Sequence, residues 1–181
     1  MPTSAAEAPR RIAVIGCSGS GKSTLAARIA AQRGLPYIAT DPVFWAPGWT
    51  PTPSSEVTAW LRAAAAAEAW VMDGNFEDRR DILWDRAELI VWIDLPLGVT
   101  LWRGARRNLG WWLTGAKVWG GLPMTLRKAL GGLRHTLASH GLKRRAYPAF
   151  LAAYPPGKVV RLASARAVAA WLTEPAGRAS R

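Results

Sequence analysis

The segment GCSGSGKS, residues 16–23, directly follows the apolar run at residues 12–15. It has the spacing GxxxxGKS, which forms a phosphate-binding loop when a buried strand leads into it and a helix leads out of it. In that setting, successive backbone N–H groups point at one anion, and the glycines allow a close backbone approach that a Cβ would block. The segment therefore requires a strand, a tight turn and a helix in this order, and it predicts that the chain binds a nucleoside triphosphate.

The polar residues of this loop have distinct predicted roles. Lys22 reaches the β- and γ-phosphates, and the Ser23 hydroxyl ligates Mg²⁺. The helix predicted from Lys22 to about Arg33 adds roughly half a positive charge beside the phosphates. The predicted nucleotide-binding residues are Gly16, Ser18, Gly19, Ser20, Gly21, Lys22, Ser23 and Thr24.

Charge is distributed unevenly along the 181 residues. The net charge is +12, yet residues 1–94 contain 9 Lys or Arg against 11 Asp or Glu, whereas residues 95–181 contain 15 against 1. No acidic residue occurs from Leu95 to Thr173. Such a basic block attracts polyanions, which include nucleotide phosphates, nucleic acid and anionic membrane surfaces, and composition alone does not choose among them.

The length fits one domain with its own core and is too short for two ordinary domains. We expect residues 1–10 to be a disordered lead, residues 11–174 to form the domain and residues 175–181 to be a flexible tail. No apolar run approaches the roughly 20 residues of a membrane-spanning helix, and residues 1–10 lack the apolar stretch of a secretory signal. The single cysteine, Cys17, cannot form an internal disulfide. These features predict a cytoplasmic protein.

Apolar runs alternate with helical patterns, which is typical of βαβ units in a parallel sheet. Strands are predicted at residues 11–15, 36–39, 69–73, 88–94 and 158–162. Further helices are predicted after a cap at Thr52 or Ser54, over 77–86, from Pro96 onward, within 124–153 and from about Ser164. Residues 110–123 are rich in Trp and Gly, so we expect an irregular, mobile lid at about 108–124. The glycines and the proline within 124–153 predict a broken helix.

Two acidic residues end predicted strands. Asp73 ends a strand that we expect beside the phosphate-loop strand, where folds of this kind hold Mg²⁺ directly or through water. An Asp before Gly is also an ordinary turn residue. Asp94 ends the next strand, but Leu95 and Pro96 follow it, so we interpret it as a helix cap. The predicted metal ligands are Ser23 and Asp73.

Two arginines and a third acid complete the predicted chemistry. Arg103 and Arg107 lie four residues apart, so a helix presents both on one face, where they suit a transferring phosphoryl group; a solvated basic face is the alternative. Asp41 follows the second strand at the sheet edge where open α/β folds bind ligands. Its carboxylate can accept the proton of an acceptor hydroxyl, although Asp before Pro is also a common turn starter.

Together these residues resemble the adenylate-kinase-like P-loop kinases called DNA topology modulation proteins. The similarity covers nearly the whole domain and lies in TDPVFWAPGW, WVMDGNF, RDILWDRAELIVWIDLP, WRGARR, KRRAYPAFL and VVRLASARAVAAWL. It implies a P-loop NTPase α/β/α sandwich of nucleoside- and shikimate-kinase type, with a five-stranded parallel sheet of order 2-3-1-4-5 and a small lid. By position it makes Asp41 the acceptor-side acid, Asp73 the Walker B-like acid, and Arg103 and Arg107 lid arginines. The family usually has Tyr where this chain has Phe76.

The leading hypothesis is a phosphotransferase of the adenylate or nucleoside-phosphate kinase type, which uses Mg²⁺ and ATP to phosphorylate a small acceptor. The predicted catalytic residues are Lys22, Asp41, Arg103 and Arg107, and the predicted acceptor-binding residues are Asp41, Trp45, Asn75 and Arg80. The alternative is a nucleic-acid-binding ATPase or regulator, whose basic half contacts phosphates while Trp111, Trp112 and Trp119 stack on bases. In a third interpretation, residues 110–121 rest on an anionic membrane or form a partner interface.

Overall fold

The computed structural model describes residues 8–119 and 121–173. The predicted tail, residues 175–181, and most of the predicted lead, residues 1–10, lie outside these ranges. Within the described chain, Arg10 is already tied to the domain, because its backbone N–H donates to Glu88 Oε2 at 2.7 Å. None of the described helices combines the length and the apolar character needed to cross a bilayer.

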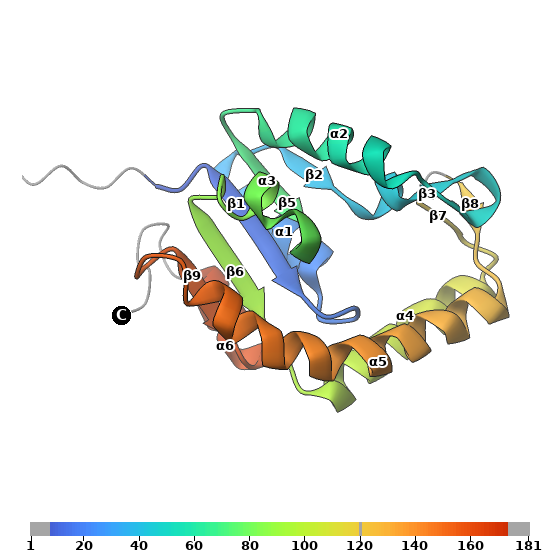
Figure 1. The fold of residues 1–181 in the computed structure, drawn as a ribbon. Coiled ribbons are helices and arrows are strands. Elements are labelled where there is room, and N and C mark those ends of the chain that lie inside the picture. The colour runs from blue at the N-terminus through green and yellow to red at the C-terminus, as the bar shows by residue number, and fades with distance from the viewer. Residues whose placement is uncertain (1–7, 120, 174–181) are drawn as a thin grey trace, which may run out of the picture.

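Five parallel strands form the central sheet, in the order β2-β5-β1-β6-β9 (Figure 1). They are β1 (Arg11–Gly16), β2 (Tyr37–Ala39), β5 (Trp70–Asp73), β6 (Leu89–Ile93) and β9 (Val159–Leu162). Each lies within one residue of its predicted bounds, because each of these strands is an apolar run bounded by turns. Numbered among themselves, the strands have the order 2-3-1-4-5 that the resemblance implied. Val14 of β1 is in register with Asp73 of β5, so the phosphate-loop strand and the Asp73 strand are neighbours, as expected.

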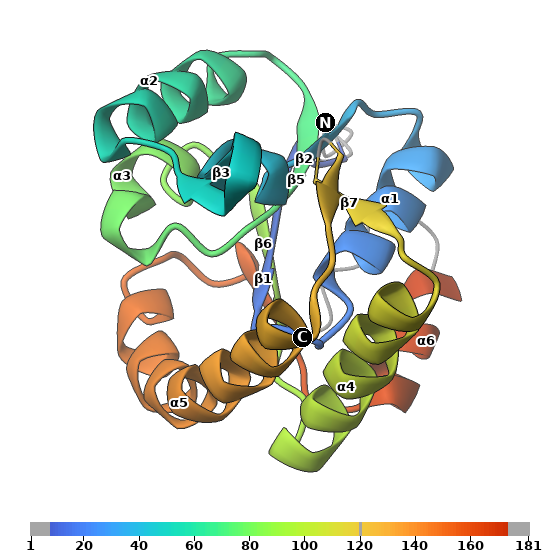
Figure 2. The same cartoon turned by 90° about the vertical axis from the view of Figure 1, so that its right-hand side faces the viewer.

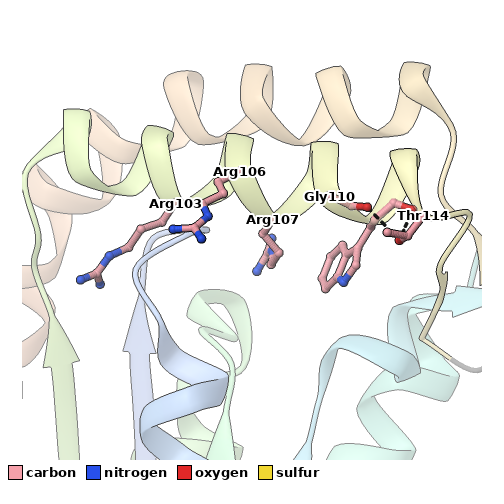
Figure 3. A pocket seen from close by; sticks show the side chains of 6 residues that line it. Arg103, Arg106, Arg107, Gly110 and Thr114 are labelled. Atoms are coloured by element: carbon pink, nitrogen blue, oxygen red, sulfur yellow. Dashed lines mark hydrogen bonds between the residues drawn. The ribbon is translucent and has the colours of Figure 1, made fainter.

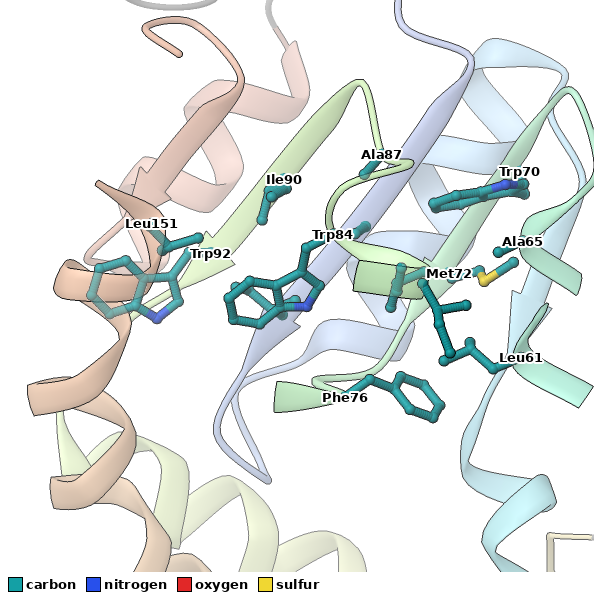
Figure 4. Close-up of a cluster of buried hydrophobic side chains, with 14 of the residues drawn as sticks. Leu61, Ala65, Trp70, Met72, Phe76, Trp84, Ala87, Ile90, Trp92 and Leu151 are labelled. Atoms are coloured by element: carbon teal, nitrogen blue, oxygen red, sulfur yellow. The ribbon is translucent and has the colours of Figure 1, made fainter. Parts of the chain in front are cut away.

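Helices cover both faces of the sheet and make the three-layer sandwich (Figures 1 and 2). On one face, α1 (Lys22–Arg33) and α6 (Ala165–Thr173) bury a cluster that includes Ile29 and Leu172 against the strands. The other face is covered by α2 (Ser54–Ala65), α3 (Arg80–Leu83) and the end of α5 (Leu126–Leu151). Figure 4 shows the aromatic and aliphatic side chains of this second core, among them Trp70, Trp84 and Trp92. These two cores fix the position of the sheet edge at which the candidate site lies.

The helix α4 (Leu97–Leu113) runs antiparallel to α5, and their tip carries the short strands β7 (Lys117–Val118) and β8 (Leu122–Pro123). Two expectations fail here. Residues 110–113 continue α4 instead of being irregular, and α5 is one unbroken helix. Contact between the helices explains the second result: a Cβ at Gly132 would lie 2.8 Å from Asn108 Nδ2, so the glycine permits close packing rather than a break. Pro148 lies in the last turn of α5, where it does not interrupt the packing.

Helix termini also depart from the sequence predictions. The N-cap of α2 is Pro53, with no side-chain cap, so neither Thr52 nor Ser54 caps this helix. The Ser54 hydroxyl instead accepts a hydrogen bond from Arg79 at 2.5 Å. The helix expected over 77–86 is a 3₁₀ turn, η3 (Glu77–Arg79), followed by the single turn of α3. Asp94 is not a helix cap, because α4 is capped at Pro96 and the buried Asp94 carboxylate is bound by two arginines.

Candidate active site

The phosphate loop connects β1 to α1 along a path that side chains would block. Gly19 has a φ of 77°, and a Cβ there would lie 2.2 Å from the Thr100 carbonyl oxygen. At Gly16, with a φ of 149°, a Cβ would lie 2.6 Å from the Ile93 carbonyl oxygen. The loop therefore fits against the end of β6 and the start of α4 only with glycine at these positions.

Lys22 folds back over the loop that it follows. Its Nζ donates to the Cys17 carbonyl oxygen at 3.1 Å, so the ammonium lies above the backbone that would cradle the phosphates. Burial lowers the pKa of Lys22, and the nearby Lys143 ammonium lowers it further, whereas the Asp41 and Asp73 carboxylates raise it. Cations and carboxylates thus meet around Lys22, while Ser23 and Thr24 are exposed at the start of α1.

Asp73 lies buried at the carboxyl end of β5, next to the phosphate-loop strand. Its Oδ1 accepts a hydrogen bond from the Thr40 backbone N–H at 3.2 Å, and its backbone carbonyl accepts one from the Thr40 hydroxyl. Burial raises the pKa of Tyr37, and the Asp73 carboxylate raises it further. Ser23 also influences the Tyr37 phenol, so this tyrosine lies within range of both predicted metal ligands, and sequence reasoning did not identify it.

These donors fit a nucleotide-bound Mg²⁺. One carboxylate and one hydroxyl are few ligands, but Mg²⁺ typically keeps several waters and takes further oxygens from the phosphates. Across residues 8–119 and 121–173, no group of three or more His, Cys, Asp or Glu side chains could hold a metal ion by itself. The two donors therefore suit an ion that takes its remaining ligands from ATP and water.

Asp41 begins the 3₁₀ turn η1 (Asp41–Phe44) directly after β2, and its side chain is half-buried. Burial raises the pKa of Asp41, and the Asp73 carboxylate raises it further. The Lys22 ammonium and the Arg107 guanidinium oppose this change. Asp41 is therefore within electrostatic range of a cation of the phosphate loop and a cation of α4, although these groups are distant in the sequence.

The arginines of α4 point toward the phosphate loop. Figure 3 shows Arg103, Arg106 and Arg107 on the same side of the helix, where they line a hollow of about 490 Å³ together with Trp111. Arg103 Nη1 donates to the Ser20 carbonyl oxygen at 3.5 Å, and the Arg107 guanidinium lies 4.8 Å from the centre of the Trp111 ring. The shared face predicted for Arg103 and Arg107 is confirmed. Arg106 was missed, although it lies only three residues after Arg103, because the sequence did not show how wide the cleft-facing side of α4 is.

Two residues predicted to bind the acceptor make other contacts. Asn75 Oδ1 accepts a hydrogen bond from the Gly16 backbone N–H at 2.9 Å, so Asn75 braces the phosphate loop. Arg80 lies over the Phe150 ring, 3.9 Å from its centre, and lines a separate hollow of about 620 Å³ with acidic residues of η3 and α3. Neither side chain is placed beside Asp41 by these contacts.

Trp45 belongs to an aromatic group that joins the segment after β2 to the tip of the α4–α5 hairpin. It begins β3 (Trp45–Ala46), and its ring centre lies 5.4 Å from that of Trp49. Trp49 in turn packs on Trp119 at 5.4 Å, and its indole N–H donates to the Pro123 carbonyl oxygen at 3.0 Å. Lys128 Nζ lies 4.7 Å from the Trp49 ring centre and 5.1 Å from that of Trp45. We call Trp45, Trp49, Trp119 and Lys128 the tryptophan bridge.

A second cluster links α5 to the turn after β5. Glu77 Oε1 accepts hydrogen bonds from the Lys143 ammonium and, at 2.7 Å, from the Tyr147 hydroxyl. Burial opposes ionisation of Glu77, but Lys143 and Tyr147 lower its pKa overall. Tyr147 also packs against Trp84 and Trp92 in the core. The stretch KRRAYPAFL therefore anchors α5 and holds Lys143 within electrostatic range of Lys22.

Phe76 lies in the core. Its ring is buried and stacks on Phe44 with 5.3 Å between ring centres.

Comparison with known proteins gives the fold. No protein-family model matches the chain, and no curated protein sequence matches it. Among solved structures, a gluconokinase from Sinorhizobium meliloti 1021 matches with a TM-score of 0.51 and 22% identity over 91% of each chain. A shikimate kinase from Aquifex aeolicus matches with a TM-score of 0.42 and 22% identity over 55% of this chain and 75% of that one. The sheet order, the phosphate loop and the first of these matches define a P-loop kinase fold.

Proposed function

We propose that this chain is a phosphotransferase that uses Mg²⁺ and ATP to phosphorylate a small anionic acceptor. The observation that carries the proposal is the phosphate loop with Lys22 folded over it and Arg103 of α4 donating to its Ser20 carbonyl oxygen, while Asp41 lies within electrostatic range of Lys22 and Arg107. Phosphoryl transfer needs a phosphate cradle, cations for the developing charge and a positioned acceptor. The loop supplies the cradle, Lys22 and Arg107 supply cations, and Asp41 supplies a base between them.

Each residue of the site has its own role in the proposed reaction. The loop amides and Lys22 hold the β- and γ-phosphates. The Asp41 carboxylate accepts the proton of an acceptor hydroxyl, whose oxygen then forms a bond to the γ-phosphorus while the bond from that phosphorus to the leaving ADP oxygen breaks. Arg103 and Arg107 stabilise the charge on the transferring group from the α4 side. Ser23 and Asp73 would hold Mg²⁺, which neutralises phosphate charge when it is bound.

The α4–α5 hairpin acts as the lid in this proposal. It carries the arginines on the side that faces the phosphate loop and meets the segment after β2 through the tryptophan bridge. Closure by this hairpin would exclude water from the γ-phosphate, since water would otherwise compete with the acceptor.

A nucleoside monophosphate, the acceptor of adenylate-kinase-type enzymes, is the first acceptor to test. Trp45, which follows Asp41 in the segment after β2, offers a stacking surface, and Lys128, whose Nζ lies 5.1 Å from the centre of that ring, offers a cation for an acceptor phosphate. Hydroxylated sugar acids are the second class, because they share the negative charge and the hydroxyl that Asp41 would deprotonate.

The test measures ADP release by the purified full-length chain with Mg²⁺ and ATP, against a panel of nucleoside monophosphates and sugar acids. We expect acceptor-dependent release that Lys22→Ala reduces by at least about 100-fold, because the variant lacks the cation on the β- and γ-phosphates. Arg28→Ala is the matched control, since Arg28 is exposed on the same helix. Activity that is indifferent to Lys22→Ala would contradict the proposal, as would the absence of nucleotide binding.

The nucleic-acid alternative gains little support from the expected stacking residues. Trp111 and Trp119 pack against each other with 6.4 Å between ring centres, and Trp119 also packs on Trp49. Only Trp112 of the three predicted residues is exposed. Cytoplasmic localisation and the oligomeric state stay predictions for experiment.

A further inference from the structure

The exposed large apolar side chains of this protein are concentrated on one hairpin. Of nine such residues in the described chain, eight lie on α4 or α5, and the ninth is Tyr37. Six of the eight follow helical spacing along the two helices: Trp102, Leu109 and Leu113 on α4, and Leu126, Leu130 and Leu137 on α5. We call these six residues the outer face. Leu113 is 74% exposed and Trp102 is 68% exposed, so these side chains are not covered by the rest of the chain.

On α4, the outer face is a stripe separate from the residues that pack against α5. The intervals of four and seven residues place Trp102, Leu109 and Leu113 along one stripe of the helix. The buried Gly104 and Asn108 lie on a second stripe against α5. Arg103 and Arg107 lie on a third stripe, toward the phosphate loop (Figure 3), and Arg106, four residues after Trp102, lies at the border between this stripe and the outer face.

Contacts between the two helices set the leucines side by side. A Cβ at Gly104 would lie 3.7 Å from the Leu133 side chain, and Asn108 Nδ2 donates to the Ala129 carbonyl oxygen at 3.4 Å. This antiparallel register puts Leu109 level with Leu130 and Leu113 level with Leu126. The outer face is therefore a continuous apolar strip two helices wide.

Positive charge borders this strip, with no negative charge to offset it. Arg127 and Arg134 are exposed on α5 beside Leu126 and Leu130, and neither forms an ion pair with any residue that the structure describes. Neither helix contains an acidic residue, and neither does the segment that connects them. A partner that covers the strip must therefore carry negative charge at its border.

We propose that the outer face docks the protein on an anionic membrane surface, with α4 and α5 lying in the plane of the interface. A paired amphipathic face with leucines, an exposed tryptophan and flanking arginines suits the boundary between acyl chains and anionic headgroups. The helices are not long and apolar enough to span a bilayer, so the binding is peripheral. A second copy fits less well, because a twofold contact through this face would bring arginine borders with no acidic counterpart together.

This inference is independent of the proposed phosphotransfer, since Trp102, Leu109 and Leu113 do not line the hollow beside the arginines. Docking through the outer face would leave the arginines directed at the phosphate loop, and the nucleotide site would stay open to solvent.

The experiment is flotation of the full-length chain with vesicles of phosphatidylcholine alone or with 30% phosphatidylglycerol. We expect binding only to the anionic vesicles, and at least tenfold weaker binding in 0.5 M salt, because exposed charges are screened. The double variant Leu113→Glu with Leu130→Glu should lose at least tenfold in vesicle affinity, as should Arg127→Glu with Arg134→Glu. The matched controls are Leu142→Glu, which alters an equally exposed leucine on α5 away from the strip, and Arg166→Glu on α6.

The outcomes separate the possible partners. Far-ultraviolet circular dichroism and thermal unfolding are used to verify that each variant is folded. We expect all of them to fold, because the substituted side chains are exposed. Absence of binding to anionic vesicles near 0.15 M salt would overturn the proposal. A dimer in sedimentation velocity that the two leucine substitutions dissociate would assign the face to a second copy, and equal losses in the control variants would show that the face is not the contact.

Discussion

The phosphate loop and the tryptophan bridge flank the same site, yet they are built in different ways. The loop is a local structure: its path is set by glycines whose missing side chains let the backbone approach Thr100 and Ile93. The bridge joins residues as far as 70 positions or more apart, such as Trp49 and Trp119, through ring contacts and one lysine. The first is fixed by steric exclusion and tolerates almost no change, whereas the second is a sum of weak contacts, which we expect to lose strength gradually.

The largest effect should follow a substitution in the loop. Gly19→Ala places a Cβ 2.2 Å from the Thr100 carbonyl oxygen at a φ of 77°, so the loop must shift away from α4. We expect ATP binding, measured by calorimetry, to be lost, and a loss of about 1–3 kcal/mol in unfolding free energy from backbone strain alone. Gly98→Ala is the control, because no atom lies within 4 Å of a Cβ there. Unchanged ATP affinity in Gly19→Ala would show that the loop is not sterically fixed.

A smaller effect is expected where the loop and the acceptor side meet. Asp41→Asn removes the proposed base but keeps the side-chain volume, so kcat should fall by about 10²–10⁴ while ATP affinity stays nearly unchanged. Asp78→Asn, at an exposed carboxylate outside the cleft, should leave kcat unchanged. A variant that loses ATP affinity and keeps kcat would place Asp41 in nucleotide binding instead.

The same carboxylate predicts the direction of the pH dependence. Burial raises the pKa of Asp41 above its ordinary value, and the charged form is the one that accepts the proton. The rate should therefore fall as the pH falls through this raised pKa, and the acidic limb should be absent from the residual activity of Asp41→Asn. An identical limb in both proteins would assign it to another group.

The smallest effect should come from the tryptophan bridge. Lys128→Met removes the ammonium near Trp45 and Trp49 but keeps an unbranched chain, so we expect a loss of about 0.5–1 kcal/mol in unfolding free energy and a fall of a few degrees in Tm. Lys117→Met, at an exposed lysine on the same hairpin tip, is the control. A loss above 3 kcal/mol in unfolding free energy would show that the tryptophan bridge tolerates substitution as poorly as the phosphate loop.

Sequence patterns predicted most of the sheet and one half of the candidate site. The five strands are short apolar runs between turns, and α1 begins and ends at the predicted residues, Lys22 and Arg33. Prediction was less successful for the hairpin, where glycines suggested a break in α5. A glycine can break a helix or allow a neighbouring helix to pack closely. At Gly132 the facing residue, Asn108, decides this, and a sequence pattern does not reveal which residue faces the glycine.

The acceptor side required the folded chain for the same reason. Asn75 and Arg80 follow the Asp73 strand in sequence, but one braces the phosphate loop and the other lies over Phe150. Lys128 has no motif that marks it, and only the packing of α5 brings it to Trp45 and Trp49.

The sequence alone determined that this protein has a phosphate loop between a buried strand and a helix, because local sterics and hydrogen bonding define that structure within a dozen residues. Only the tertiary structure decided which cations face Asp41, which aromatic rings meet across the site and which leucines lie side by side on the outer face. Those arrangements depend on contacts between segments far apart in the chain, whose relative positions are set by the packing of the whole domain.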